Sequence, residues 1–311
     1  MKAKMINTTT IEGILYQHDL SLKTSGENSK NPGTQYITGT IDIATDDAGL
    51  NIVSVHYTYV TATTAKGNTN QTFTTLKNII DGVYGTKMKD GADKAVKLHV
   101  DSAIGLNEFY SDRSGQEELV SVKRNEGGFI RVIDTLTEDE KLRNTFKTDI
   151  ILTKVRRLEA DPERELPEKM ILEGAIFNFR GDLLPVSFSA ENPNAMDYFE
   201  GLEISPTSPV FTCVWGRQIS TTTVRQIVEE SAFGEPSIRE VPSTRKDFLV
   251  TGAITEPYVW DDPSTITALE IKEAQANREI ALATMKKTQE EYRAKRNAAT
   301  APSNSDDGFD F

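Results

Sequence analysis

The feature that most constrains the fold is a series of short alternating segments in the first 160 residues. Residues 35–44 alternate isoleucine with tyrosine and threonine, and residues 50–62 alternate valine and tyrosine with small polar residues. A period of two is typical of a strand with one buried face. Between them, Asp46-Asp47-Ala48-Gly49 supplies turn residues and predicts a hairpin. Further strands are predicted at 11–22, 95–100, 118–124, 129–134 and 147–158, with one helix at 73–80.

This list of elements is that of a small closed barrel of the OB type, with a β-sandwich as the main rival. A charged stretch bracketed by prolines, residues 160–167, marks a junction. Beyond it, a second all-β unit contains the hairpin turn Arg180-Gly181-Asp182. We expect a mainly β chain, with a first OB-like barrel over 1–160 and a second OB-like domain over 161–262. Strands are expected at 171–179, 183–190, 210–219 and 248–254, and helices at 194–203 and 221–230.

A long α-helix is predicted over 263–298. Asp262-Pro263-Ser264 provides its cap, and residues 266–297 contain neither glycine nor proline. The last turns carry several cations, so this half is expected to project, to pack on another subunit or to lie near phosphates. Homo-oligomerisation is therefore left open. Residues 299–311 are expected to form a flexible acidic tail.

Several classes of protein are excluded by what the sequence lacks. No apolar run is long enough to span a bilayer and no signal peptide is recognisable, so we expect a cytoplasmic protein without a membrane partner. The single cysteine, Cys213, and three scattered histidines offer no metal-ligand spacing. No phosphate-binding loop or nucleophile elbow is present. We therefore expect no catalysis, no metal and no cofactor.

Cations interleaved with aromatic residues predict a nucleic-acid site, although the net charge is -12. Single strands are held by cations that follow the backbone and by flat rings on which bases stack. Arg217, for example, lies two residues from Trp215 and therefore on the same strand face. Core packing of the aromatic residues is an equally open alternative. The predicted nucleic-acid-binding residues are Tyr57, Tyr59, Lys123, Arg124, Arg131, Arg180, Trp215 and Arg217.

The chain closes on an acidic, Phe-ending peptide, Ser305-Asp306-Asp307-Gly308-Phe309-Asp310-Phe311. It resembles the acidic tip of the bacterial single-stranded DNA-binding proteins and of several phage counterparts. Asp306 and Asp307 match the acidic run and Phe311 matches the last residue, whereas Gly308-Phe309-Asp310 replaces an Ile-Pro step. The resemblance implies OB barrels that hold a single strand without sequence preference. It also implies a tail, with Asp306, Asp307, Phe309, Asp310 and Phe311, that competes with DNA and recruits replication proteins.

We therefore predict a sequence-independent single-stranded DNA-binding protein, phage-encoded and acting in the cytoplasm of an infected host. Its roles would be DNA replication, recombination or repair. The alternative is a structural, assembly or adaptor protein, such as a virion component, that binds no nucleic acid. The acidic net charge favours that alternative. The nucleotide site size, DNA or RNA preference and the tail's partner are not determined by the sequence.

Overall fold

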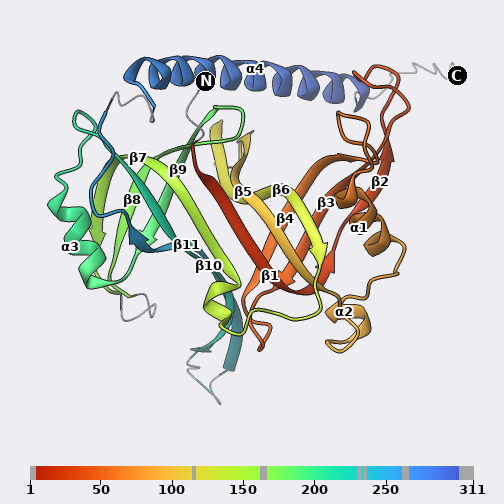
Figure 1. Ribbon diagram of the computed structural model, residues 1–311, viewed down its shortest axis with the longest axis horizontal. Coiled ribbons are helices and arrows are strands. Elements are labelled where there is room, and N and C mark those ends of the chain that lie inside the picture. Colours follow the sequence, from red (N-terminus) through yellow and green to blue (C-terminus); the bar gives the residue numbers. More distant parts are fainter. Residues whose placement is uncertain are drawn as a thin grey trace, which may run out of the picture.

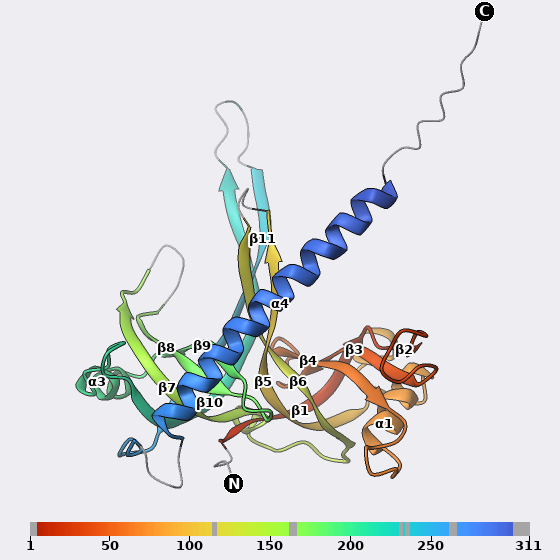
Figure 2. The same cartoon turned by 90° about the horizontal axis from the view of Figure 1, so that it is seen from above.

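Two β-barrels lie side by side, and a long helix, α4 (Ala268–Thr300), runs across both (Figures 1 and 2). The computed structural model describes residues 5–113, 117–161, 167–229, 233, 237–260 and 266–300. Within these ranges, no helix is both long enough and apolar enough to cross a membrane.

The first barrel closes from five strands in the order β1-β3-β4-β6-β5-β1, and only the β4–β6 pair is parallel. Ile11, Ile41 and Val55 point into it from alternating positions and are fully buried. α1 (Gln71–Ile80) connects β4 to β5 and begins where the Asn70 side chain accepts a hydrogen bond from Thr72 N. The strands are β1 (Asn7–His18), β3 (Gln35–Ala44), β4 (Ile52–Thr61), β5 (Lys97–Ser111) and β6 (Glu118–Val132), beside the short β2 (Ser21–Thr24) and α2 (Lys87–Asp90).

The second barrel closes in the order β7-β8-β9-β11-β10-β7, and only β9 and β11 run parallel. α3 (Pro193–Gly201) connects β9 to β10. The aromatic rings of Phe146, Phe188 and Phe248 pack together at its centre. Its strands are β7 (Asn144–Leu158), β8 (Lys169–Phe177), β9 (Leu183–Ala190), β10 (Val210–Glu229) and β11 (Ser237–Ala253), preceded by a 3₁₀ turn, η1 (Glu140–Leu142).

The two barrels share one topology. In each, the third strand pairs in parallel with the fifth, the first pairs with the fourth, and a helix lies between the third and fourth. This closed five-stranded Greek-key arrangement is the OB fold. The expected mainly β class, with OB-like barrels and a C-terminal helix, is confirmed.

Two expected elements differ from the structure. The strand expected at 147–158 as the last of the first unit is β7, and it pairs with β8 and β10 of the second barrel. It also pairs with β1, which explains why its sequence alone assigns it to neither barrel. The helix expected at 221–230 is wrong, because β10 continues to Glu229 and pairs with β11 throughout. The run Thr221-Thr222-Thr223-Val224 is β-branched and favours this extended conformation.

Polar side chains fasten the barrels to each other. Gln218 of β10 and Asn125 of β6 are buried and exchange two amide hydrogen bonds, of 2.8 and 3.0 Å. The Asn7 amide donates to the carbonyl oxygens of Ile104 and Phe177, one in each barrel. Because such buried groups are satisfied only when both barrels are in place, the contacts fix the relative position of the barrels.

The helix α4 is anchored from Ile271 to Arg293. Ile271 and Ala274 pack on the second barrel, whereas Arg278 pairs with the buried Glu108 of β5. Further along, Lys286 and Arg293 pair with Glu117 at 2.9 and 3.2 Å. These two cations therefore do not project freely. They hold the helix against the β5–β6 hairpin.

Candidate nucleic-acid interface

The outward face of β3 and β4 carries two stacked tyrosines. The Tyr36 and Tyr59 ring centroids are 4.5 Å apart with 32° between the planes, and Tyr59 is 45% exposed. The Tyr59 hydroxyl lies 3.2 Å from Ser25 Oγ, which orients the ring. Lys23 of β2 lies opposite Tyr36 in the register and makes no ion pair with any described residue. We call Lys23, Tyr36 and Tyr59 the tyrosine face.

A β-bulge explains why Tyr59 points outward although Tyr57 does not. The β3–β4 register shifts between Ile37, opposite Val60, and Gly39, opposite Tyr57. Tyr57 is only 1% exposed and lies inside the first barrel, where burial raises the pKa of its hydroxyl. The expectation that Tyr57 and Tyr59 share one binding face is therefore wrong. A bulge inserts an extra residue, so the period of two fails at this point.

Next to the tyrosine face, polar side chains continue along β3 and β4. Thr40 Oγ lies 3.2 Å from His56 Nδ1, and burial, together with the charge of Arg124, lowers the pKa of His56. The Arg124 guanidinium donates to Glu126 at 2.8 and 3.0 Å. Its charge is therefore already matched by a carboxylate.

A cleft of about 750 Å³ lies where the barrels meet. Its floor consists of two rows across β1, β7 and β10. The first row is Thr8, Lys147 and Trp215, and the second is Thr10, Thr145 and Arg217. Trp215 is 39% exposed and its indole covers Gly252, where a side chain would collide with the ring.

Lys141, on η1, completes the lining of this cleft. We call Thr8, Lys141, Lys147, Trp215 and Arg217 the inter-barrel cleft. None of its three cations forms an ion pair with a residue that the structure describes. The acid that lines the cleft is Asp139, whose carboxylate caps η1 by accepting from Lys141 N.

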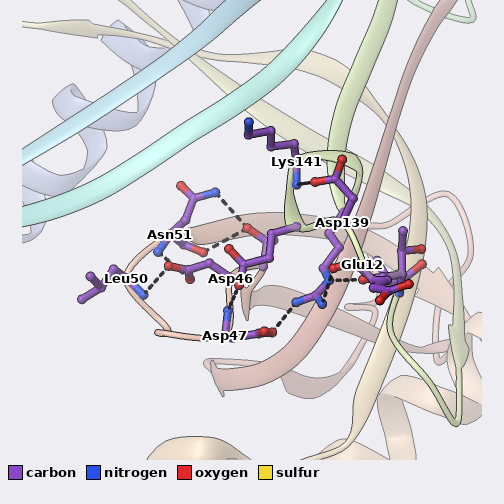
Figure 3. Close-up of polar contacts among 12 residues, drawn as sticks. Glu12, Asp46, Asp47, Leu50, Asn51, Asp139 and Lys141 are labelled. Carbon is purple, nitrogen blue, oxygen red and sulfur yellow. Dashed lines mark hydrogen bonds and ion pairs between the residues drawn. The ribbon is translucent and has the colours of Figure 1, made fainter.

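The segment that carries Lys141 is held by a network shown in Figure 3. Asp46 accepts from the backbone of Leu50 and Asn51, which closes the β3–β4 turn. Arg143 is buried and pairs with Asp47 at 2.5 Å, and this ion pair holds the pKa of Asp47 below its usual range. The β3–β4 turn of the first barrel therefore holds the segment that lines one side of the cleft.

The cleft continues toward the first barrel. A second hollow of about 290 Å³ shares Lys141 and Arg217 with it and reaches Asn51. A third hollow, with Ser54 and Lys246 among its lining residues, shares no residue with the second. It is lined by Ser220 and Thr222 and so lies on the opposite face of β10 from Arg217 and Thr221.

The other predicted residues are spread over the surface. Arg131 is exposed beside Phe129, and its nearest acid, Asp101, is 3.9 Å away. Arg180 lies at the tip of the β8–β9 hairpin with its guanidinium 5.3 Å from the Phe179 ring centre. It lines a separate hollow of about 540 Å³.

Lys123 is not on an open face. Its ammonium lies 5.3 Å from the centres of both the Phe188 and Phe248 rings and donates to Ser187 O. Burial lowers the pKa of Lys123. The residue therefore packs β6 against the second barrel, which corrects its prediction as a DNA contact.

Lys23, Tyr36, Lys141 and Lys147 are not among the residues predicted from the sequence to bind nucleic acid. Lys147 is recognisable only once β7 is assigned to the junction, since its neighbours Thr8 and Trp215 come from distant strands. The tail residues Asp306, Asp307, Phe309, Asp310 and Phe311 lie outside the described residues. Among the residues that are described, no group of three or more histidine, cysteine or acidic side chains is arranged to hold a metal ion.

Comparisons with known proteins give a family and similar solved structures. A family model described as YorF matches residues 5–288. No curated protein matches the chain. A crystal structure of a deletion mutant of the single-stranded DNA binding protein from Thermus aquaticus is similar, with a TM-score of 0.46 and 13% identity. The similarity covers 84% of this chain and 98% of that one.

Proposed function

The chain belongs to the YorF family, whose description specifies no activity, and we propose that this protein binds single-stranded DNA through the tyrosine face. The observation that carries the proposal is the stacked pair of partly buried Tyr36 and exposed Tyr59 on the second and third strands of an OB barrel. That face is where OB folds bind oligonucleotides. Each base stacked on such a ring contributes roughly 1–3 kcal/mol.

Sequence independence follows from the kind of contact. Every base has a flat face for stacking, whereas phosphates are bound by charge alone. Lys23 lies opposite Tyr36 and is free to bind a phosphate. We propose that exposed Arg131 and Arg180 add further phosphate contacts, and that Arg124 takes part by exchanging Glu126 for a phosphate.

We also propose that the protein is phage-encoded and acts in DNA replication, recombination or repair. In this role the tail would recruit partner proteins through Asp306, Asp307, Phe309, Asp310 and Phe311. The support is the composition of this segment, since exposed phenylalanines among aspartates suit a pocket supplied by another protein. Pull-down of host replication proteins with the tail peptide, with Phe309 and Phe311 replaced by alanine as control, tests this part.

Fluorescence anisotropy with labelled oligo-dT, and with duplex of equal length as the control ligand, tests the binding function. We expect strand-selective binding that weakens with salt. Tyr36→Ala and Tyr59→Ala should each weaken it by roughly 5- to 150-fold, which corresponds to the loss of about 1–3 kcal/mol of stacking.

Tyr292→Ala is the matched control, because this tyrosine is exposed on α4 and should not contact DNA. Failure of the wild-type protein to bind any oligonucleotide would sink the proposal. It would instead favour the assembly or adaptor role, which self-association of the protein would then support.

A further inference from the structure

We infer that the inter-barrel cleft is a second site for single-stranded DNA, in which a base stacks on Trp215 and phosphates bind Arg217, Lys147 and Lys141. This inference rests on the proposed function and extends it to a different face. The cleft is built on the first and fourth strands of the second barrel together with β1. The tyrosine face, in contrast, lies on the second and third strands of the first barrel.

Charge is the first argument. Several surface arginines among the described residues are matched by carboxylates: Arg156 with Glu173 at 2.9 Å and Arg157 with Glu168 at 2.6 Å are examples. In the inter-barrel cleft, three cations converge without a described carboxylate partner, and one acid, Asp139, is among the lining residues. Asp46 and Glu140 line the adjoining hollow, but their carboxylates accept from backbone N–H groups of the β3–β4 turn and form no ion pair with these cations. A cluster of cations without ion-pair partners is where a polyanion gains most from neutralisation.

The geometry of β10 is the second argument. Trp215 and Arg217 are two residues apart on one strand, so their side chains leave the same face about 7 Å apart. The indole is partly exposed and is supported from below by Gly252. A flat ring beside a guanidinium is the combination that holds a base and its phosphate.

The rigidity of the floor is the third argument. The Gln218 backbone carbonyl accepts hydrogen bonds from the Asn144 and Asn51 amides, at 2.6 and 3.4 Å. The Gln218 side chain is paired with Asn125 of the first barrel. Because both barrels hold this part of β10, the cleft is formed before the ligand arrives, which lowers the entropic cost of binding.

The placement of the two sites predicts how their variants combine. The inter-barrel cleft and the tyrosine face lie on different strands, so an oligonucleotide long enough to reach both can occupy both. Two linked sites on one strand bind more tightly than either alone. We therefore expect variants of the two sites to weaken binding of a long oligonucleotide independently.

Titration of the full chain with oligo-dT of about 30 nucleotides, longer than the roughly 4–16 that one OB fold covers, tests the inference. Trp215→Ala should weaken binding at least about 5-fold, and Trp215→Phe, which keeps a ring, should restore most of it. Arg217→Ala and Lys147→Ala should each reduce the salt slope by about 0.7, as expected for one lost phosphate contact. Lys272→Ala on α4 is the matched control for loss of a lysine.

Tryptophan emission gives a direct readout of contact. The chain has two tryptophans, and Trp260 is packed on Phe211 with its indole N–H bonded to Pro209 O. Oligo-dT should quench the tryptophan emission of the wild-type protein, and this quenching should disappear in Trp215→Phe, where Trp260 remains.

The acid in the cleft gives a further test. Asp139→Asn keeps a capping side chain but removes the negative charge, so it should tighten binding of oligo-dT a few-fold.

The results separate the two proposals. If oligo-dT binds and Tyr59→Ala weakens it, while the cleft variants neither weaken binding nor change the quenching, the inference about the cleft is overturned and the proposed function stands. If the wild-type protein does not bind oligo-dT, both fail. Circular dichroism of Trp215→Ala and Arg217→Ala should match the wild type, and Trp215→Phe keeps the test valid should Trp215→Ala misfold.

Discussion

At the scale of single residues, the two neighbouring tyrosines of β4 have opposite environments. Tyr57 is enclosed in the barrel, and its hydroxyl has no hydrogen-bond partner among the described residues. Tyr59 is half-exposed and stacks on Tyr36. A buried hydroxyl without a partner costs stability, whereas an exposed one is hydrated. The same side chain therefore contributes to the core at one position and presents a ring to ligands two residues later.

We predict that Tyr57→Phe raises the free energy of unfolding by about 1 kcal/mol, because it removes the unpaired hydroxyl and keeps the ring. Urea denaturation measures the change. Tyr59→Phe is the control and should change stability by less, since it loses only a bond of 3.2 Å to Ser25 at the surface. Affinity for oligo-dT should be unaffected by Tyr57→Phe. A clear loss of affinity would place Tyr57 at the interface after all.

Two histidines should make stability depend on pH. Burial lowers the pKa of both His18 and His56 from 6.5. The positive charge of Lys89 lowers the pKa of His18 further and that of Arg124 lowers the pKa of His56 further, whereas the negative charge of Asp19 partly opposes both shifts. The unfolded chain binds protons at these imidazoles below about pH 6.5, and the folded chain resists them. The free energy of unfolding should therefore fall as the pH drops from 7.5 to 5.5.

Urea denaturation across this pH range checks the prediction with His18→Gln, His56→Gln and the double variant. Each replacement should flatten the pH dependence, and the double variant should flatten it most. An equally steep fall in the double variant would assign the effect to other groups.

Glu12 should not contribute to this fall between pH 7.5 and 5.5. Burial raises the pKa of Glu12, but hydrogen bonds with Thr137 and His99 outweigh burial and hold the pKa below its usual value.

At the scale of elements, α4 is joined to β5 by an ion pair that differs from those around it. Arg278 and Glu108 are both largely buried, at 16% and 10% side-chain exposure, and their closest atoms are 2.5 Å apart. Arg278 also donates to Leu183 O of the second barrel. Lys286 and Glu117, about two turns of helix nearer the hairpin tip, are much more exposed.

We predict that Arg278→Ala costs about 3–5 kcal/mol of stability, because it leaves Glu108 buried without a counter-charge. Lys286→Ala, which breaks a surface pair, should cost no more than about 1 kcal/mol. Thermal or urea unfolding of the two variants compares them directly. Equal costs would mean that Glu108 is hydrated in solution and that α4 is held less tightly than its contacts indicate.

The elements also show how far the sequence alone determines this fold. The alternation in β3 and β4 predicts their strands correctly, and the long segment without glycine or proline predicts α4. The placement of β7 is not predictable in this way, because its partners β1, β8 and β10 are set by long-range pairing. The candidate site is only partly predictable for the same reason. Trp215 and Arg217 lie two residues apart on one strand, so the sequence shows that they share a face, whereas Lys147 lies beside Trp215 only because β7 pairs with β10.

At the scale of the whole molecule, two barrels of one topology present different surfaces. On the outward side of β8 in the second barrel, Glu173 pairs with Arg156 and with Lys154, at 2.9 and 3.9 Å. β3, the strand of the first barrel that corresponds to β8, presents Tyr36, which stacks on Tyr59 of β4. Since a neutralised ion-pair surface has little attraction for phosphates, the second barrel would contribute to DNA binding chiefly through the inter-barrel cleft.

Net charge acts on the same scale. With -12 overall, the protein repels DNA at long range and attracts it only near the uncompensated cations. Asp306, Asp307 and Asp310 contribute three of these charges within six residues. They are thus a local source of competition with phosphates for Lys23 or for the inter-barrel cleft.

Removal of residues 301–311 should therefore tighten binding of oligo-dT at low salt and leave it unchanged at high salt. The reason is the screening length, which is about 30 Å at 0.01 M and about 3 Å at 1 M. Anisotropy titrations over this salt range measure the effect. Replacement of the three aspartates by asparagine should reproduce the gain, whereas Phe309→Ala with Phe311→Ala, which keeps the charge, should not. An unchanged affinity at 0.01 M would show that the tail does not compete for the sites, and its aspartates would then matter only to a protein partner.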